Sequence, residues 1–411
     1  MNLTSRIFFI LPASLILWFI GGPTLSCDAG QVEEKDAGQD QAVELLLRAR
    51  QFAIEVDDSE QRDVLMGDIA QDLYKLGETK RARDAFALIN SDSWRDSSQK
   101  PMLESQLRAK DYVEAQRTVE AMKTVQGKAE ALCSVASAQW EADKHAAARR
   151  TLSAVMEIYA QHRPKLNNSV FLEELRLTQD ELGDAAGASK TKRELAKVSG
   201  GYSVSVCTWG PGYLDSESNK LRLAGRAETE KGDLEAARST LRRAADSIET
   251  APGGDAKATL LDRIATDQAN AGDLEGARVS FSQAVERAIA LPNGLQRNLL
   301  LREIARDQAS AGDIEGGLIT ATKISDIGLK DQAVHGIAVS RVEQVGLESG
   351  LKTAEKIQTD QEYDVTLVDV ARFLGKQHDA PRVLLVVDKI HSPYMKALGL
   401  EEAAEAMIKQ K

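Results

Sequence analysis

The chain has 411 residues, of which 28% are charged, 43% are hydrophobic and 5% are aromatic, with 9 Pro and 3 Cys. This apolar fraction excludes a disordered chain, and so few cysteines exclude a small disulfide-stabilised domain. The formal net charge of -11 argues against a molecule that binds nucleic acid or anionic membranes over its whole surface.

Residues 1–26 have the composition of a secretory signal peptide. Arg6 gives a positive start, Ile7 to Ile20 form an apolar run, and small residues precede Cys27. The apolar run is shorter than a membrane-spanning helix needs. We therefore expect cleavage and export to the periplasm or the medium; the alternative is an uncleaved N-terminal anchor.

Cys27 fits a second kind of signal only in part. A lipoprotein signal ends at a cysteine that is acylated after cleavage, and Ser26 satisfies its preference for a small residue, whereas Thr24 and Leu25 do not. Lipid anchoring at Cys27 therefore stays an alternative to full release. Residues 27–40 are polar and acidic, which predicts a flexible tether.

Internal repetition governs the rest of the chain. The segments DRIATDQANAGDLEGARVSF (262–281) and REIARDQASAGDIEGGLITA (302–321) align without a gap at a shift of 40 residues. The same register places a small residue on the second helix of nine predicted helix pairs, at spacings of 33 to 49 residues; these are Ala82, Ala115, Ala148, Ala188, Ala237, Ala277, Gly317, Gly350 and, as Val, Val383. A closing helix is expected near 393–410.

One unit shows why such pairs form. Residues 258–270 carry an apolar stripe at helical spacing, and Gly272 allows the left-handed turn that ends the helix. Asp273 is placed to cap the next helix, on which Ala277 permits close approach. A single pair cannot bury both of its faces, so neighbouring pairs must stack.

These residues resemble the tetratricopeptide repeat, through Ile264-Ala265, Gly272, Ala277, Phe281 and Ala284. Two departures are clear: a glutamine stands where the family has an aromatic late in the first helix, and several units exceed the family's period. Lys110, Asp143 and His378 also replace the turn glycine. The resemblance implies an all-α, right-handed solenoid of about nine antiparallel helix pairs with a C-terminal capping helix, which binds a protein or peptide on its concave face.

The resemblance also indicates candidate binding residues on first helices. They are Arg222, Arg226, Asp262, Thr266, Arg302 and Arg306. Four guanidinium groups on one face would suit an acidic partner or a C-terminal carboxylate. The alternative interpretation is a solvated face with ion pairs inside each helix.

Residues 199–215 interrupt the repetition and divide the repeats into 41–198 and 216–411. This insert is rich in glycine and carries Tyr202, Trp209 and Tyr213. Such rings in a loop between helices favour a binding surface, or they pack over the groove or over a joint between the two halves.

Chemical signatures of catalysis or metal binding are absent from the sequence. The five His are scattered, and no motif for a metal, a nucleophile or a phosphate loop occurs. Cys133 is expected to be a small buried residue, with pairing to Cys207 as the alternative. We therefore expect no enzyme and no cofactor.

The sequence as a whole predicts an exported scaffold or adaptor that binds a protein or peptide. A periplasmic carrier or sensor subunit, with a pocket for a small ligand or peptide under residues 199–215, is the main alternative. An envelope enzyme that uses paired carboxylates in a helical ring is a third.

Overall fold

The computed structural model describes residues 29–198 and 216–409, and within these ranges the chain forms α-helices, one short 3-10 helix (Ile248–Thr250) and no strand. The expected all-α class is confirmed for this part of the chain. Most helices alternate between a first and a second helix of a hairpin. The first helices are α2 (Ser59–Lys75), α4 (Asp92–Arg108), α6 (Val125–Glu141), α8 (Ser169–Glu181), α11 (Glu217–Glu230), α13 (Gly254–Asn270), α15 (Leu295–Ser310), α17 (Ile327–Gln344) and α19 (Asp360–Lys376).

The second helices carry the small residues that the repeat register predicts. They are α3 (Thr79–Phe86), α5 (Tyr112–Ala121), α7 (His145–Leu166), α9 (Ala185–Val198), α12 (Leu234–Asp246), α14 (Leu274–Ala290), α16 (Ile314–Ala321), α18 (Leu347–Ala354) and α20 (Ala380–Val387). All nine predicted positions are buried on these helices. A Cβ at Gly317 would lie 2.5 Å from the carbonyl oxygen of Ala305, so α16 approaches the backbone of α15 directly.

The turns within the hairpins follow the sequence register. Gly272 has φ 75°, and the three residues that replace glycine, Lys110, Asp143 and His378, have φ of 59°, 57° and 56°. The amide of Asp273 binds the carbonyl of Gln268 at 2.8 Å, and the Asp273 side chain accepts the Gly276 N–H at 3.2 Å. The expected left-handed turn and the expected N-cap are thus both present.

A buried hydrogen bond occupies the place where the tetratricopeptide pattern has an aromatic ring. Gln268 Oε1 accepts the Ser280 hydroxyl at 2.7 Å, and Gln308 Oε1 accepts the Thr320 hydroxyl at 2.6 Å. The same bond joins residues twelve apart at Gln106–Thr118, Gln139–Thr151 and Gln179–Thr191. The glutamine therefore joins the two helices of a unit instead of filling space between them.

Buried aspartates join each 33-residue unit to the next. Asp96 accepts the backbone N–H groups of Lys123 and Thr124 at 2.9 and 2.7 Å, where helix α6 begins. Asp63, Asp331 and Asp364 make equivalent bonds to residues 27 and 28 positions later. Because each carboxylate takes two otherwise unpaired amides, it fixes the register between neighbouring hairpins.

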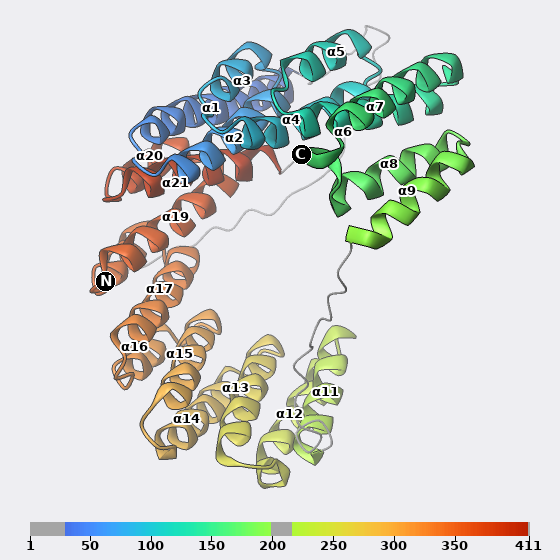
Figure 1. Ribbon diagram of the computed structural model, residues 1–411. Helices are drawn as coiled ribbons and strands as arrows, with labels where there is room; N and C mark the ends of the chain where they lie inside the picture. The colour runs from blue at the N-terminus through green and yellow to red at the C-terminus, as the bar shows by residue number, and fades with distance from the viewer. Residues whose placement is uncertain (1–28, 199–215, 410–411) are drawn as a thin grey trace, which may run out of the picture.

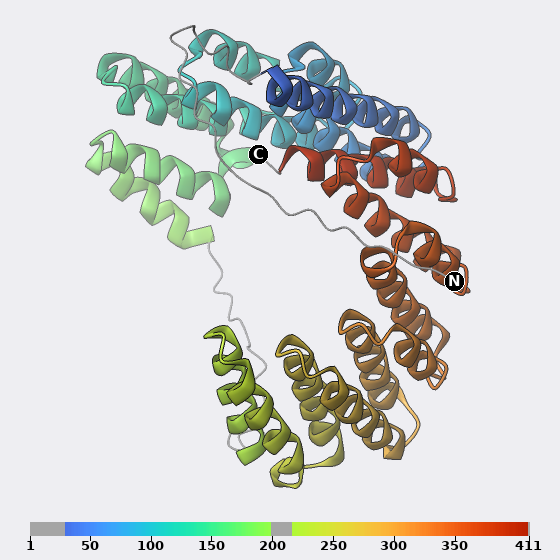
Figure 2. The same ribbon diagram turned by 180° about the vertical axis from the view of Figure 1, so that it is seen from behind.

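The helices follow one another around an open ring that is interrupted between α9 and α11 (Figures 1 and 2). The ring is closed on its other side by the two ends of the chain. Helix α1 (Ala29–Ile54) packs along α21 (Pro393–Ile408), the helix expected near 393–410. In space, α1 takes the place of a second helix for α21.

One hydrophobic core includes residues from both ends of the chain. Leu45, Leu46 and Ala49 of α1 share it with Leu400 and Ala404 of α21, and all five are fully buried. The prediction of a flexible tether over residues 27–40 is therefore wrong from residue 29 onward, since α1 begins at Ala29.

An acidic cluster accompanies this closure. Burial, together with the neighbouring Asp72 and Asp68 carboxylates of α2, raises the pKa of Glu401 on α21 to about 9. Glu401 is therefore protonated at neutral pH and can lie beside Asp72 without charge repulsion.

Candidate functional site

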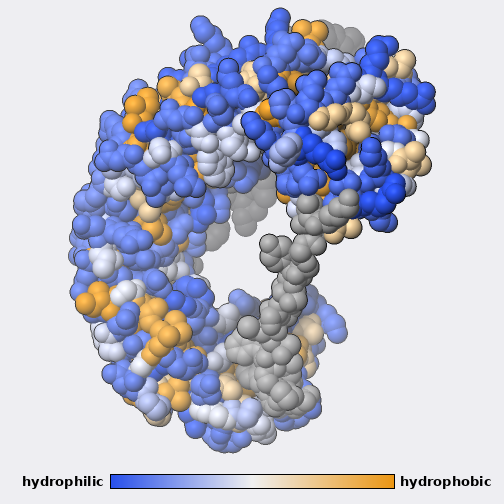
Figure 3. Space-filling view, in the orientation of Figure 1, coloured by the Kyte–Doolittle hydropathy of each residue, from blue (hydrophilic) through white to orange (hydrophobic). Residues whose placement is uncertain are grey.

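In the pairs α2–α3, α4–α5, α13–α14 and α15–α16, the first helix lies toward the inside of the ring and the second helix outside it (Figure 1). Figure 3 shows the hollow at the centre of the molecule and a mainly hydrophilic surface around it. Two pockets are lined by first helices alone, so both lie on the side that faces away from the second helices. We call this side the inner face.

The first inner-face pocket lies between α15, α17 and α19 and has a volume of about 500 Å³. Arg302 and Arg306 line it, as do Gln332, His335 and Glu362. Arg302 donates to Gln332 at 2.8 Å and to Glu303 at 3.1 Å. The pocket thus carries charges of both signs, held in a hydrogen-bonded network.

His335 extends this network to α19. Its Nε2 lies 2.9 Å from Asp369 and its Nδ1 lies 3.2 Å from Glu362. Burial acts to raise the pKa of Asp369, but the hydrogen bond with His335 and the charge of Arg372 hold it below its usual value. Arg372 in turn lies 3.6 Å from Glu402, so polar side-chain contacts continue from α17 through α19 to α21.

The predicted arginines do not form a free basic surface. Arg222 is only 8% exposed and forms an ion pair of 2.9 Å with Asp267, so its expected role on an open face is wrong. Arg226 pairs with Glu230 at 3.1 Å on the same helix, and Arg306 pairs with Glu303. The alternative interpretation, ion pairs within helices, describes Arg226, Arg302 and Arg306.

Asp262 is also unavailable at the surface, because its side chain is buried. Burial and the adjacent Asp307 carboxyl of α15 raise the pKa of Asp262 well above its usual range. The pKa of Asp307 is raised as well, first by its own burial. Asp262 on α13 and Asp307 on α15 are thus neighbouring carboxyls, and the burial of Asp262 beside Asp307 favours its neutral form.

The second inner-face pocket lies between α4, α6 and α8 and has a volume of about 420 Å³. Four glutamates line it, Glu104, Glu141, Glu174 and Glu181, against one cation, Arg108. Burial, followed by the charge of Glu130, raises the pKa of Glu174 to about 7. The exposed side chain of Leu177 adds an apolar contact surface. This pocket is suited to a group that is positive in part and apolar in part.

The remaining predicted residues divide into buried and undescribed ones. Cys133 is 1% exposed and unpaired, and burial raises the pKa of its thiol to about 12, so it is the small buried residue expected. Cys27, Tyr202, Cys207, Trp209 and Tyr213 lie outside the described residues, and so does the signal-like segment. The described part of the chain holds no group of three or more metal-binding side chains, and none of its helices is long and apolar enough to span a membrane.

Sequence reasoning missed the acidic pocket and the inter-unit aspartates. The aspartates had a detectable signal, because Asp63 and Asp96, and likewise Asp331 and Asp364, are 33 residues apart. The glutamates recur at a similar interval, with Glu104, Glu141 and Glu174 in successive first helices. Both sets were hidden among the many other charges of these helices.

Comparison with known proteins gives no family. No family model matches the chain, and no curated protein matches it. Among solved structures, the crystal structure of Ton1535 from Thermococcus onnurineus NA1 is similar at 14% identity, with a TM-score of 0.26, over 77% of this chain and 93% of that chain. A likeness at this TM-score supports no conclusion on fold or function.

Proposed function

We propose that the protein is an exported scaffold or adaptor, a solenoid of tetratricopeptide-like helix pairs that binds a segment of another protein on its inner face. The observation that supports this proposal is the pair of pockets lined by first helices alone, of about 420 and 500 Å³. Pockets of this size accept side chains of an extended or helical segment.

The charges of the inner face favour a partner segment with basic side chains. The α4–α6–α8 pocket carries four glutamates and one arginine, whereas the arginines of the α15–α17–α19 pocket are paired with carboxylates. An acidic partner would have to displace those carboxylates, while a basic partner meets glutamates that form no ion pair with any described residue. Leu177, which is 54% exposed, offers an apolar contact in the lining of the acidic pocket.

Site-specific photo-crosslinking in the native cell envelope tests the proposal. A photoreactive residue at Leu177 should capture a partner, and the same residue at Val113, a somewhat more exposed position on the second helix α5, should not. Capture at Val113 alone, or equal capture at both positions, would contradict binding on the inner face.

The charge of the partner segment is tested separately by neutralisation. The triple variant Glu104→Gln, Glu141→Gln, Glu181→Gln should weaken capture and reduce its dependence on salt, because each glutamate contributes a screened attraction. The matched control neutralises three exposed glutamates of second helices, Glu120, Glu235 and Glu275. Equal loss in both triple variants would mean that only net charge matters, and the basic-segment proposal would fail.

A further inference from the structure

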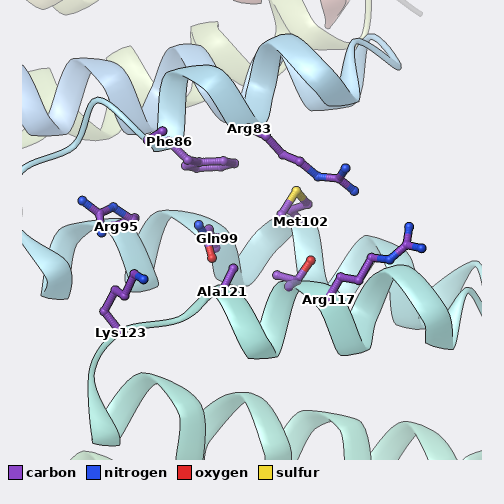
Figure 4. A pocket seen from close by; sticks show the side chains of 10 residues that line it. Arg83, Phe86, Arg95, Gln99, Met102, Arg117, Ala121 and Lys123 are labelled. Carbon is purple, nitrogen blue, oxygen red and sulfur yellow. The ribbon is translucent and has the colours of Figure 1, made fainter.

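A third pocket lies on the side of the second helices, away from the inner face. It is formed by α3, α4 and α5 and has a volume of about 360 Å³ (Figure 4). Its lining contains four cations, Arg83, Arg95, Arg117 and Lys123, and no acid. Such a lining is unexpected in a chain whose net charge is -11.

The four cations lie at the two ends of the pocket. Arg95 and Lys123 are at one end and Arg83 and Arg117 at the other (Figure 4). Arg83 and Arg117 share a single carboxylate, Glu114, which neutralises only one of them. In the described part of the chain, the ammonium group of Lys123 forms no ion pair.

Two polar groups in the lining are buried without a hydrogen-bond partner among the described residues. They are Oε1 of Gln99 and Nε of Arg95. Gln99 is only 5% exposed, and its Oε1 is buried without a partner in the described chain. A buried amide without a partner destabilises a fold, so its presence in a pocket points to a ligand that completes its hydrogen bonds. The guanidinium of Arg95 is held in place by Asp92, 3.0 Å from its Nη1, and by the carbonyl oxygen of Ile89, which accepts from its Nη2. Asp92 balances the charge of Arg95, so Lys123 supplies the net positive charge at this end.

The floor between the two charged ends is apolar. Phe86 of α3 and Met102 of α4 line it and are 2% and 4% exposed. Figure 4 shows their side chains between the two pairs of cations. Together these groups are complementary to a ligand with an apolar body and a negative charge at one end.

We propose that this pocket binds an apolar carboxylate with an amide N–H beside it, the chemistry of an N-acylated apolar amino acid or of the last residue of a polypeptide. The carboxylate lies at the end formed by Arg95 and Lys123, where it accepts a hydrogen bond from the Lys123 ammonium. The side chains of Arg95 and Gln99 turn toward the ligand, so that the Arg95 Nε–H donates to the carboxylate and Gln99 Oε1 accepts the ligand's N–H. The apolar side chain of the ligand covers Phe86 and Met102. An inorganic anion can form ion pairs with the cations, but it makes no apolar contact with the floor and donates no hydrogen bond to Gln99.

Isothermal titration of the full mature chain with N-acetyl-L-phenylalanine tests this site directly. Three ligand comparisons define the chemistry: the C-terminal amide of the same compound, N-acetylglycine and inorganic phosphate should each bind at least about tenfold more weakly. Equal binding of the amide, or of phosphate, would overturn the proposal. A hexapeptide that ends in phenylalanine identifies the source, since equal or tighter binding indicates a polypeptide end and weaker binding a free small molecule.

Protein variants separate binding from stability. Lys123→Gln should weaken binding about five- to tenfold, while Lys80→Gln, an exposed lysine of α3 outside the lining, should leave it unchanged. Gln99→Met removes the unpartnered amide, so it should weaken binding yet keep or raise the urea midpoint of unfolding. Unchanged affinity in both Lys123→Gln and Gln99→Met would refute the site. Because no inner-face residue takes part, this result does not depend on whether the inner face binds a partner.

Discussion

Helix α1 should hold the ring closed through its packing on α21, and Leu46→Ala tests this. Leu46 is fully buried in the core that both ends of the chain share. Truncation of a buried leucine removes its transfer free energy and leaves a cavity, so we expect a loss of about 3 to 5 kcal/mol in the free energy of unfolding. In a repeat array each unit is stabilised by its neighbours, so the loss should concentrate on α1 and α21.

Hydrogen exchange locates the effect. A local loss of about 3 kcal/mol corresponds to exchange that is roughly 100-fold faster for amides of α21, while amides of α13 and α14, far around the ring, should change little. Leu295→Ala is the matched control, because Leu295 is 69% exposed and its truncation should stay within about 0.5 kcal/mol. If Leu46→Ala were as mild as the control, with no faster exchange in α21, then α1 would not close the ring.

Three further predictions concern stability, measured by urea or thermal unfolding. Because the pKa of Glu401 is raised to about 9 in the folded protein, its contribution to the free energy of unfolding is fully present below pH 4.5 and is lost as the pH rises toward 9. Glu401→Gln should therefore make the fall in stability between these pH values less steep. Parallel plots of stability against pH for the two proteins would refute this prediction. Lys110→Gly should stabilise by about 0.5 to 1 kcal/mol because Lys110 has φ 59°, whereas Arg108→Gly inside α4 should destabilise; a loss at both would contradict the turn geometry. Ser280→Ala should lower the free energy of unfolding by about 1 to 3 kcal/mol, because it leaves Gln268 Oε1 buried without a donor. Adding Gln268→Leu should recover part of that loss, and no recovery would mean that the hydrogen bond contributes little to stability.

The local architecture of the described chain could be read from the sequence because it depends on residues close together in the chain. Small residues at the repeat spacing fixed where the second helices pack, and the alignment showed that Lys110, Asp143 and His378 stand at turn positions. Their positive φ values follow from the geometry of that turn, which they share with Gly272 and Gly312. The departure from the aromatic pattern was also visible, although the bond from Gln268 to Ser280 that explains it was not.

The candidate sites could be predicted only in part, because burial and charge depend on groups far apart in the sequence. Arg222 is 45 residues from Asp267, and no periodicity shows that the two form a buried pair. The pocket of Arg95, Gln99 and Lys123 likewise depends on how α3, α4 and α5 meet. Sequence spacing indicated which helix each of these residues belongs to, and packing decided which of them share a site.

Sequence alone determined the helical class and the repeat register, since both follow from apolar and small residues at fixed local spacing. The closure of the ring was decided only by tertiary structure. Residues 29–40 contain little to bury, which predicted a tether, and the apolar stripe of residues 42–56 packs in part against α2, the next helix. Its other partner is α21, more than 300 residues away, and no local spacing predicts that α1 and α21 share one core.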